Sequence, residues 1–549
     1  MMKRIFVVLL ALVAIIVFAT SAHANVMVYG LGVNPGKSMK TVDFYYRLNE
    51  SADNGVTIEV YDSGDNLIRT ITNAPNARGL NAVTWDGKDD QGNNVPAGDY
   101  YFTVTASDDG HTDWDMISVD GPGNIMYSGK GLAVNKNPNS PHYGKVYILN
   151  TIDGTSGNTG AVEQLDGVFT FWAHGTPIPE ESYIDTMIWW PNSTDPYGAS
   201  PWWLTIGPDD HIYVGSWKDG NETVYEFDPY FTTKIKILTE EDLTNHGNVC
   251  GLAVLGTGAD RVLYTVDEDL EPAWSIWKYE IGEGPFPWTA MPTLFIEGIT
   301  NTHTRQLFNM VFTANAETLF TSDYVSAAPP PGYTLANLCK WDVTTTPPTL
   351  IWEKLQTEEY RWICGIDYDD GHGRLAAATR IGKIFIFNSA GDSIAVIENS
   401  GSNRGCAFDA VGNLYVVNSS IEWWRVWSPP DGPNTSTTKS PFMFKIGVVG
   451  VSEYVNVPKA ITAKNIPNPF SLETEIVYSI PSKSYCSVKI YDVSGKLVRN
   501  LVNGMFEPGC YRVRWDGTND AGMRLASGIY FYRVSAGNLA VTKEVILVR

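Results

Sequence analysis

The sequence predicts an all-β protein in which a six-bladed, or alternatively seven-bladed, β-propeller lies between two small β-sandwich modules. Two observations lead to this fold class. Apolar residues alternate in short runs that Gly, Asn, Asp or Pro interrupt about every 8 to 12 residues, which is typical of β-strands and turns. Two independent families of internal repeats then divide the chain, one at its two ends and one in its middle.

The first repeat joins the two ends of the chain at a constant offset of 430 residues. VYDSGDNLIRTI from Val60 matches IYDVSGKLVRNL from Ile490, and the segment from Val83 matches the segment from Val513. Over 60–104 the two copies align without a gap, and 15 of 45 residues are identical. Alternating apolar residues place one face of each strand on a core, and Trp85 is the central core residue that this pattern predicts. Both ends are therefore expected to fold as one kind of β-sandwich.

These repeated segments carry a resemblance. YDSGDNLIR and YDVSGKLVR, together with WDGKDDQG and WDGTNDAG, resemble the Ig-like module of flagellar hook-capping proteins (FlgD-like). The C-terminal copy adds Asn468-Pro469-Phe470, a strand over Thr474 to Ile480 and the ending TKEVILVR, and so resembles the C-terminal sorting domains of type IX secretion cargo. The resemblance implies two Ig-like sandwiches, and it implies export or anchoring through secretion machinery for the last one.

The second repeat fills the middle of the chain. Six units, each with the pattern strand, polar turn, strand, begin at Gly131, Trp203, Gly251, Met310, Gly365 and Gly405. AFDAVGNLYVVNSS, in the last unit, resembles NHL-type propeller repeats, and AVEQLDGVFTFW from Ala161 could belong to a seventh blade. The strand that closes the ring is expected from DWDMISVD near Asp113 or from FMFKIG near Phe442. A solenoid is the alternative, but a closed ring leaves no long strand edge exposed.

The predicted boundaries follow from these repeats. Residues 1–24 are expected to be a signal peptide, because Lys3 and Arg4 precede an apolar run from Ile5 to Phe18 and Ala22-His23-Ala24 offers cleavage before Asn25. A retained anchor is the alternative. The first sandwich is predicted over 25–110, the propeller over 111–452 and the second sandwich over 453–549. No later apolar run is long enough for a membrane span.

Charge and cysteine usage exclude several classes of partner. The formal net charge of −22 repels phosphate backbones, so nucleic acid is not an expected partner. The six cysteines form no C-x-x-C pair and have no histidine at metal-ligand spacing, so no metal is predicted. Cys250, Cys339, Cys364 and Cys406 are expected to be buried thiols. Cys486 and Cys510 share one small domain, so for this pair the sequence leaves both a disulfide and two free thiols as alternatives.

Catalytic signatures are absent from the sequence, and no catalytic residue is predicted. The densest polar cluster is Asp367, Asp369, Asp370 and His372, which could bind Ca²⁺ or supply a general base, but which more simply makes an inter-strand turn. The same alternatives hold for Asp86, Asp89, Asp90 and Asn93, where the glutamate that closes a calcium loop is missing.

Tryptophan is the remaining candidate for ligand contact, because sixteen of the eighteen tryptophans fall in the predicted propeller. Adjacent residues of a strand point to opposite faces, so one member of each Trp pair has to lie outside a given core. An exposed indole suits sugar rings or a protein partner, and packing between blades is the structural alternative. The predicted ligand-binding residues are Trp189, Trp190, Trp202, Trp203, Trp423, Trp424 and Trp427.

The sequence therefore predicts a secreted or cell-surface bacterial protein with a non-catalytic binding or structural role. Its propeller would recognise a surface glycan or protein, and its C-terminal module would serve export or attachment. The first alternative is an extracellular propeller enzyme of the lactonase, lyase or glycosidase type that uses channel carboxylates. The second is an architectural subunit of a fibre or surface layer.

Overall fold

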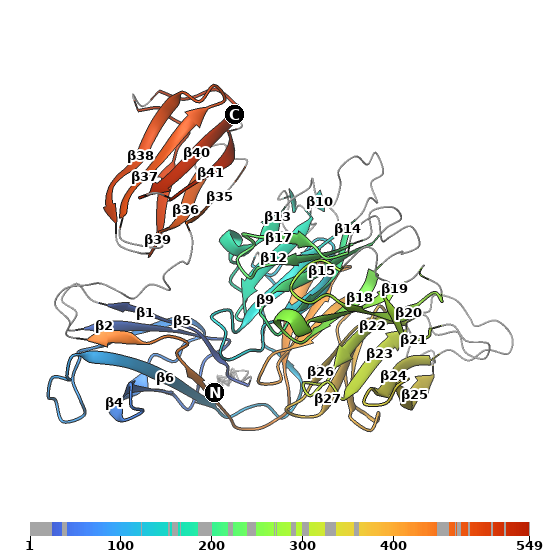
Figure 1. Ribbon diagram of the computed structural model, residues 1–549. Coiled ribbons are helices and arrows are strands. Elements are labelled where there is room, and N and C mark those ends of the chain that lie inside the picture. The colour runs from blue at the N-terminus through green and yellow to red at the C-terminus, as the bar shows by residue number, and fades with distance from the viewer. Residues whose placement is uncertain are drawn as a thin grey trace, which may run out of the picture.

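The computed structural model is almost entirely β-structure (Figure 1). It describes residues 25–547 except 36–40, 122, 152–153, 156–162, 165, 185–199, 218–222, 239–248, 268–269, 271, 287–291, 299–306, 324–335, 356–361, 447–460, 467, 469–473, 481–483, 507–508, 521–522 and 538. The predicted signal peptide over 1–24 lies outside these residues. Within them, no helix has the length and apolar character needed to cross a membrane.

Six four-stranded antiparallel sheets are found among the described residues of the central region. From the innermost strand outward, the first three are β8 (Gly129–Val134), β9 (Lys145–Asn150), β12 (Gly167–Trp172) and β13 (Tyr183–Ile184); β14 (Ser200–Ile206), β15 (Ile212–Trp217), β16 (Val224–Phe227) and β17 (Lys234–Lys236); and β18 (Val249–Leu255), β19 (Val262–Asp267), β20 (Ser275–Glu280) and β21 (Thr293–Ile296).

The other three sheets follow the same order. They are β22 (Leu307–Phe312), β23 (Thr318–Asp323), β24 (Ala336–Asp342) and β25 (Thr349–Leu355); β26 (Ile363–Asp369), β27 (Arg374–Thr379), β28 (Lys383–Asn388) and β29 (Ser393–Glu398); and β30 (Asn403–Phe408), β31 (Leu414–Asn418), β32 (Trp423–Ser428) and β7 (Asp115–Met116). Small additions are β10 (Gly154–Thr155) with β11 (Glu163–Gln164), and the 3₁₀ turns η1 (Pro179–Glu181) and η3 (Gly258–Asp260).

The six sheets close into a ring. Each innermost strand contacts the next one, from β8 through β14, β18, β22, β26 and β30, and β30 contacts β8 again. The outer strand of the last sheet is β7, from the DWDMISVD segment, which pairs with β32. Part of the segment considered for a seventh blade is β12, which pairs with β9 in the first sheet. The all-β propeller fold predicted for the middle of the chain is therefore present.

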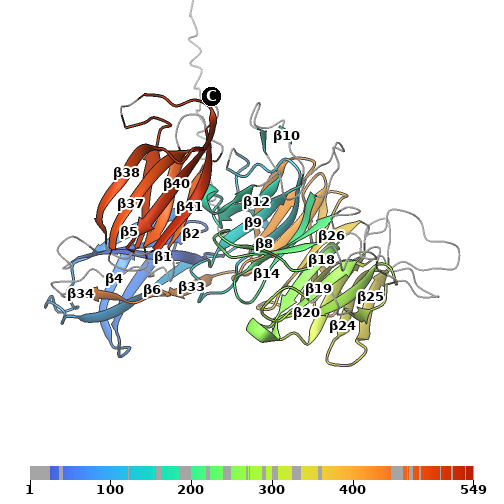
Figure 2. The same ribbon diagram turned by 45° about the horizontal axis from the view of Figure 1, so that its top comes forward.

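The N-terminal sandwich contains two strands from beyond the propeller. One of its sheets is β1 (Val28–Pro35), β2 (Val42–Leu48) and β5 (Gly79–Trp85), and the other is β4 (Leu67–Ala74), β3 (Val56–Asp62), β6 (Gly98–Asp108) and β33 (Asn434–Lys439), with β34 (Phe444–Ile446) also paired to β6. Figure 2 shows β33 and β34 beside β6. The structure corrects two expectations: 434–446 does not belong to the propeller range 111–452, and the segment from Phe442 does not close the ring.

The C-terminal sandwich explains this arrangement. Its sheets are β35 (Thr462–Ile466), β36 (Thr474–Ile480) and β39 (Gly509–Trp515), and β38 (Leu497–Phe506), β37 (Ser484–Asp492), β40 (Gly528–Ala536) and β41 (Leu539–Leu547). Here β40 pairs with β41 directly after it, with Gly528 opposite Leu547. In the N-terminal copy the equivalent Gly98 lies opposite Ile446. The propeller is thus inserted between the last two strand positions of the N-terminal sandwich.

The two sandwiches also share their hydrogen bonds, residue by residue, at the offset of 430. Trp85 Nε1 donates to the Lys88 carbonyl at 2.9 Å, and Trp515 Nε1 donates to the Thr518 carbonyl at 2.9 Å. The Asp90 carboxylate accepts from Thr70 N–H, and Asp520 accepts from Asn500 N–H, both at 3.0 Å. The acidic residues considered for a calcium loop form a turn instead, in which Asp89 Oδ1 accepts from the backbone N–H groups of Gln91 and Asn93.

The buried cysteines behave as expected for structural thiols. The structure places Cys250, Cys339, Cys364, Cys406 and Cys486 as buried thiols. Cys486 makes no disulfide, so the bridge to Cys510 that the sequence left open is not formed. Burial raises the pKa of the Cys486 thiol to about 11, which keeps it protonated near neutral pH.

The N-terminal sandwich is docked on the first and last propeller sheets through polar and aromatic contacts. Arg47 lies over the Trp172 ring at 4.2 Å, and Arg78 donates to the carbonyls of Ile117 and His174. Tyr29 OH is 2.5 Å from His174 Nδ1 and packs in a core of propeller residues. The inserted propeller and the sandwich therefore share one buried interface rather than a flexible linker.

This interface predicts a specific pH dependence. Burial lowers the pKa of His174 to about 4, and Arg78 and Arg47 add to the shift. Between about pH 6.5 and pH 4 the unfolded chain binds more protons than the folded one, so stability is lost as the pH falls through this window. His174→Gln should reduce this loss by up to about 3 kcal/mol, measured by urea denaturation at pH 7 and pH 4.5. Equal losses in the wild type and the variant would refute the assignment.

Candidate ligand site in the propeller channel

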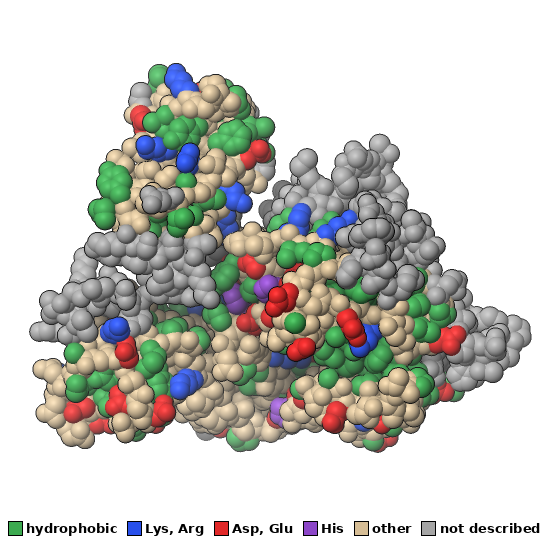
Figure 3. Space-filling model, in the orientation of Figure 1, with side chains coloured by type: hydrophobic (Ala, Val, Ile, Leu, Met, Phe, Trp, Pro, Cys, Tyr) green, Lys and Arg blue, Asp and Glu red, His purple; other side chains and the backbone are tan. Residues whose placement is uncertain are grey.

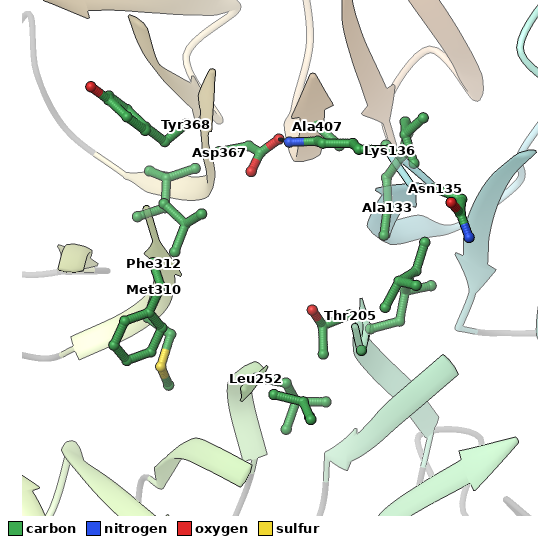
Figure 4. Close-up of a pocket in the computed structure, with 18 of the residues that line it drawn as sticks. Ala133, Asn135, Lys136, Thr205, Leu252, Met310, Phe312, Asp367, Tyr368 and Ala407 are labelled. Atoms are coloured by element: carbon green, nitrogen blue, oxygen red, sulfur yellow. Dashed lines mark hydrogen bonds and ion pairs between the residues drawn. The ribbon is translucent and has the colours of Figure 1, made fainter. Parts of the chain in front are cut away.

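A cavity of about 410 Å³ opens where the innermost strands of the ring end. Its wall takes residues from the six innermost strands in turn, which Figure 4 shows around the opening: Ala133, Thr205, Leu252, Met310, Asp367 and Ala407. The small side chains of Ala133, Thr205 and Ala407 leave the centre open, and apolar neighbours such as Val311 and Phe312 complete the wall. A concave, mainly apolar wall with a few polar groups is the usual form of a ligand site.

The main polar feature of the cavity is an ion pair. Lys136, in the turn after β8, places its Nζ 2.7 Å from Asp367 Oδ2 on β26 (Figure 4). The same carboxylate oxygen accepts from Phe408 N–H at 2.7 Å, which fixes its orientation. Burial tends to lower the pKa of Lys136, but attraction to Asp367 outweighs burial, so the net shift of the pKa is upward. Lys136 therefore stays charged near neutral pH. Its side chain is partly exposed in the cavity.

Two further carboxylates line the cavity. Asp370 accepts from Ala314 N–H at 2.9 Å, and Asp210 accepts from the Asn135 side chain at 2.9 Å. Burial, together with the neighbouring charge of Asp367, raises the pKa of Asp370. In this cavity Asp367 is thus paired with a cation, whereas Asp370 is easier to protonate than an ordinary aspartate.

The structure separates the acidic cluster that the sequence singled out. Asp369 Oδ1 accepts from Gly371 N–H at 3.0 Å, and its Oδ2 lies 2.7 Å from His372 Nδ1. These contacts form the inter-strand turn, as the simpler of the two sequence interpretations expected. Asp367 and Asp370 instead line the cavity, in the position at the propeller channel that the functional alternative considered. Their neighbour Lys136 was not foreseen, because it lies 231 residues away from Asp367 along the chain.

The predicted tryptophans fall into three groups. Trp189 and Trp190 lie outside the described residues. Trp424 and Trp427 are buried in two apolar cores of the propeller, in the packing role weighed against ligand contact, and Trp423 is half-buried. Trp203 is buried and lines the cavity, whereas the half-buried Trp202 lies 5.2 Å from Lys130 Nζ. Ligand contact by these residues stays a prediction.

One cluster outside the cavity has the donor set of a metal site. Atoms of Asp209, His211 and Glu226 lie within 4.8 Å of one another. The Arg261 guanidinium, however, donates to Glu226 Oε1 at 2.5 Å and to Tyr213 OH at 2.7 Å. This buried cation already neutralises Glu226, so we assign the cluster to the stability of the propeller. The sequence shows Asp209 and His211 in one turn, but Tyr213 and Glu226 come from β15 and β16, and Arg261 directly precedes β19.

Comparisons with known proteins agree with this division of the chain. The model of the FlgD Ig-like domain family matches residues 33–110 and 471–539. The basal-body rod modification protein FlgD of Salmonella typhimurium and that of Salmonella typhi are each 35% identical over 81 residues, which is 15% of this chain. The match spans only 34% of the length of these curated relatives.

Solved structures match over longer parts of the chain at low similarity. The structure of PorZ, an essential surface component of the type-IX secretion system of Porphyromonas gingivalis, has 13% identity and a TM-score of 0.31, covering 94% of this chain and 75% of that one. A Bacteroides thetaiotaomicron protein of unknown function has 12% identity and a TM-score of 0.37, covering 72% and 98%. The WD40 propeller domain of Doa1 has 12% identity and a TM-score of 0.35, covering 58% and 97%.

The sheets define the class of protein, a β-propeller inserted into an Ig-like sandwich and followed by a second sandwich. More particularly, the two sandwiches match the model of the FlgD Ig-like domain family over 33–110 and 471–539, and their shared hydrogen bonds show that the two modules have the same local structure. The structural similarities are too low to bear on what the propeller binds.

Proposed function

We propose that this protein is an exported, non-catalytic binding protein whose propeller recognises a glycan or a protein on a cell surface. The observation that carries the proposal is the 410 Å³ cavity at the end of the channel, with its apolar wall and the Lys136–Asp367 pair. An apolar surface with a few fixed polar groups suits the faces and hydroxyls of sugars as well as a protein side chain. The docked sandwich supports this use, because it holds the first and last propeller sheets.

The C-terminal sandwich is proposed to serve export or attachment. Its charge supports a separate role: residues 461–549 hold 11 Lys and Arg against 7 Asp and Glu, whereas the whole chain is strongly acidic. Figure 3 shows Lys and Arg side chains on its surface and acidic side chains over the propeller and the N-terminal sandwich. Opposite charge favours contact of this module with an acidic partner or surface. The predicted signal peptide over 1–24 is part of this proposal.

Two experiments test the two parts separately. The chain from Asn25 onward, screened on a glycan array and in pulldowns of surface proteins, should retain at least one glycan or protein, and retention of neither would remove the binding role. The complete chain should reach the cell surface or the medium, whereas a chain ending at residue 460 should stay inside the envelope. Identical locations for both chains would remove the export role.

One observation favours an enzyme as the second candidate. Asp370, whose pKa burial raises, and Asp367, which is ion-paired with Lys136, place two carboxyl groups in one cavity, as a general acid and a partner carboxylate require. Hydrolysis of a glycan or lactone that Asp370→Asn abolishes, while binding persists, would favour this candidate. If the wild type and Asp370→Asn bound the ligand equally well and neither turned it over, the result would favour the non-catalytic binding role.

A further inference from the structure

Each of the six innermost strands contains a β-bulge at the same place. The pairing register with the second strand shifts between Gly129 and Leu132, Pro201 and Trp203, Val249 and Gly251, Leu307 and Asn309, Ile363 and Gly365, and Asn403 and Cys406. A bulge leaves a residue out of the ladder and re-aims its side chain, and bulges are frequent beside functional sites. Because all six innermost strands share the bulge at one position, the bulge is a regular structural feature of the channel.

The bulged residues form a ring, which we call the bulge ring: Lys130, Trp202, Cys250, Phe308, Cys364 and Arg404. In each strand the bulged residue precedes the residues that line the cavity, and Trp203 and Asn309 of the cavity wall directly follow Trp202 and Phe308. The bulge ring therefore borders the cavity on the side away from the turn that holds Lys136.

Contacts across the ring show that its members converge. Cys250, Phe308 and Cys364 belong to one buried cluster, and Trp202 packs against it. Lys130, from the first sheet, lies over the Trp202 ring of the second sheet at 5.2 Å, and Arg404, from the last sheet, donates to Cys364 Sγ at 3.8 Å. The ring thus has an apolar and aromatic floor with two cations beside it.

Among the described residues, no carboxylate pairs with Lys130 or Arg404. Lys130 is 8% exposed, and no hydrogen-bond acceptor for its Nζ is found among the described residues. Gly405 packs so closely on Lys130 that a Cβ there would lie 2.3 Å from the Lys130 carbonyl oxygen, which brings Arg404 beside Lys130. Arg380 adds a third positive charge nearby. Arg404 donates only to the neutral Ser419 hydroxyl and Cys364 thiol among the described residues. Holding like charges together without an anionic partner is costly, and a bound anion would relieve that cost.

We propose that the bulge ring is a binding site for an anionic group, a carboxylate, phosphate or sulfate, carried on a ligand with a flat apolar face. Lys130 and Arg404 would hold the anion, and Trp202 and Phe308 would contact the apolar part. The protein as a whole is acidic, so two neighbouring cations, Lys130 and Arg404, that no carboxylate of the described residues pairs with point to a specific ligand rather than to a general surface charge.

The charge state of Lys130 gives the site a pH signature. Burial lowers the pKa of Lys130 to about 7, and the charges of Arg404 and Arg380 add to the shift while Cys364 opposes it. The ammonium form that an anion needs is therefore present below about pH 7 and lost above it. Affinity for an anion should fall as the pH rises from 6 to 8.

Calorimetric titration of the chain from Asn25 onward tests the proposal with phenyl phosphate, benzoate, inorganic phosphate and uncharged benzyl alcohol. At pH 6 at least one of the three anions should bind, and a preference for phenyl phosphate or benzoate over inorganic phosphate would assign the apolar contact. Lys130→Met should weaken binding at least tenfold, and it should abolish the pH dependence of benzoate binding, because the benzoate carboxylate does not titrate between pH 6 and pH 8. Lys383→Met, at a surface lysine paired with Glu398, is the matched control and should bind like the wild type.

Arg404→Met provides a second variant if Lys130→Met does not fold, and it too should weaken binding. Absence of binding by all three anions at pH 6 would overturn the proposal. Binding of benzyl alcohol as tight as that of phenyl phosphate would overturn it as well. These outcomes can be told apart from those of the glycan and protein screens, because Lys130→Met and Arg404→Met change no residue of the cavity wall.

Discussion

Phe444→Ala should lower the free energy of unfolding of the N-terminal sandwich by about 3–5 kcal/mol, the usual cost of emptying a buried aromatic position. Phe444 is 1% exposed, and its ring centroid lies 5.4 Å from that of Phe44 and 6.0 Å from that of Trp85. The residue is thus a central part of a core whose other buried members come from 26–106 and Ile446. Hydrogen-exchange protection of the β6 amides measures the effect in the intact chain.

The neighbouring Met443 supplies the control for this prediction. Its side chain is 38% exposed, so Met443→Ala should change stability by less than about 0.5 kcal/mol. The amides of β40, the strand equivalent to β6 in the C-terminal sandwich, should keep their protection in both variants. If Phe444→Ala exchanged no faster than Met443→Ala, β34 would not complete the N-terminal sandwich.

Arg261→Met should destabilise the propeller by about 3–5 kcal/mol, because it leaves the buried carboxylate of Glu226 without its cation. Arg261 and Glu226 are 6% and 3% exposed, and their contact is 2.5 Å. Burial tends to raise the pKa of Glu226, but His211 and Arg261 outweigh it and the net shift of the pKa is downward. The carboxylate is therefore charged in the folded protein, and urea denaturation measures the loss.

Two comparisons separate this buried pair from ordinary surface charge. The double variant Arg261→Met/Glu226→Gln should recover part of the lost stability, since it removes the uncompensated charge. Lys278→Met breaks an exposed pair with Glu280 and should cost less than about 1 kcal/mol. Equal effects of Arg261→Met and Lys278→Met would contradict the structural role assigned to the cluster.

The repeated segments were sufficient to predict both sandwiches, because the offset of 430 residues carries over into paired hydrogen bonds such as those of Trp85 and Trp515. The pattern of residues 434–439 alone did not predict that they join the N-terminal sandwich as β33. Its inward residues are Ser436 and Thr438, which are buried but bond to the backbone N–H and carbonyl of Val28. A buried polar face looks like a linker when apolar alternation is the criterion.

The candidate sites were predictable only in part, for a related reason. The turn residues around Asp369 lie next to one another in the sequence, so their local contacts could be expected. The Lys136–Asp367 pair and the bulge ring instead bring together residues from different sheets. Their partners are set by closure of the ring, which the spacing of repeats predicts, and by the register inside each sheet, which it does not.

The most direct test of the proposed binding role is an affinity measurement on a blocked cavity. Any ligand retained in the glycan or protein screens should bind Ala133→Trp at least 100-fold more weakly than the wild type, because the indole fills the opening that Ala133 borders. Leu67→Trp, at a 50% exposed position of the N-terminal sandwich, should bind normally. Undiminished binding by a folded Ala133→Trp variant would contradict recognition through the channel.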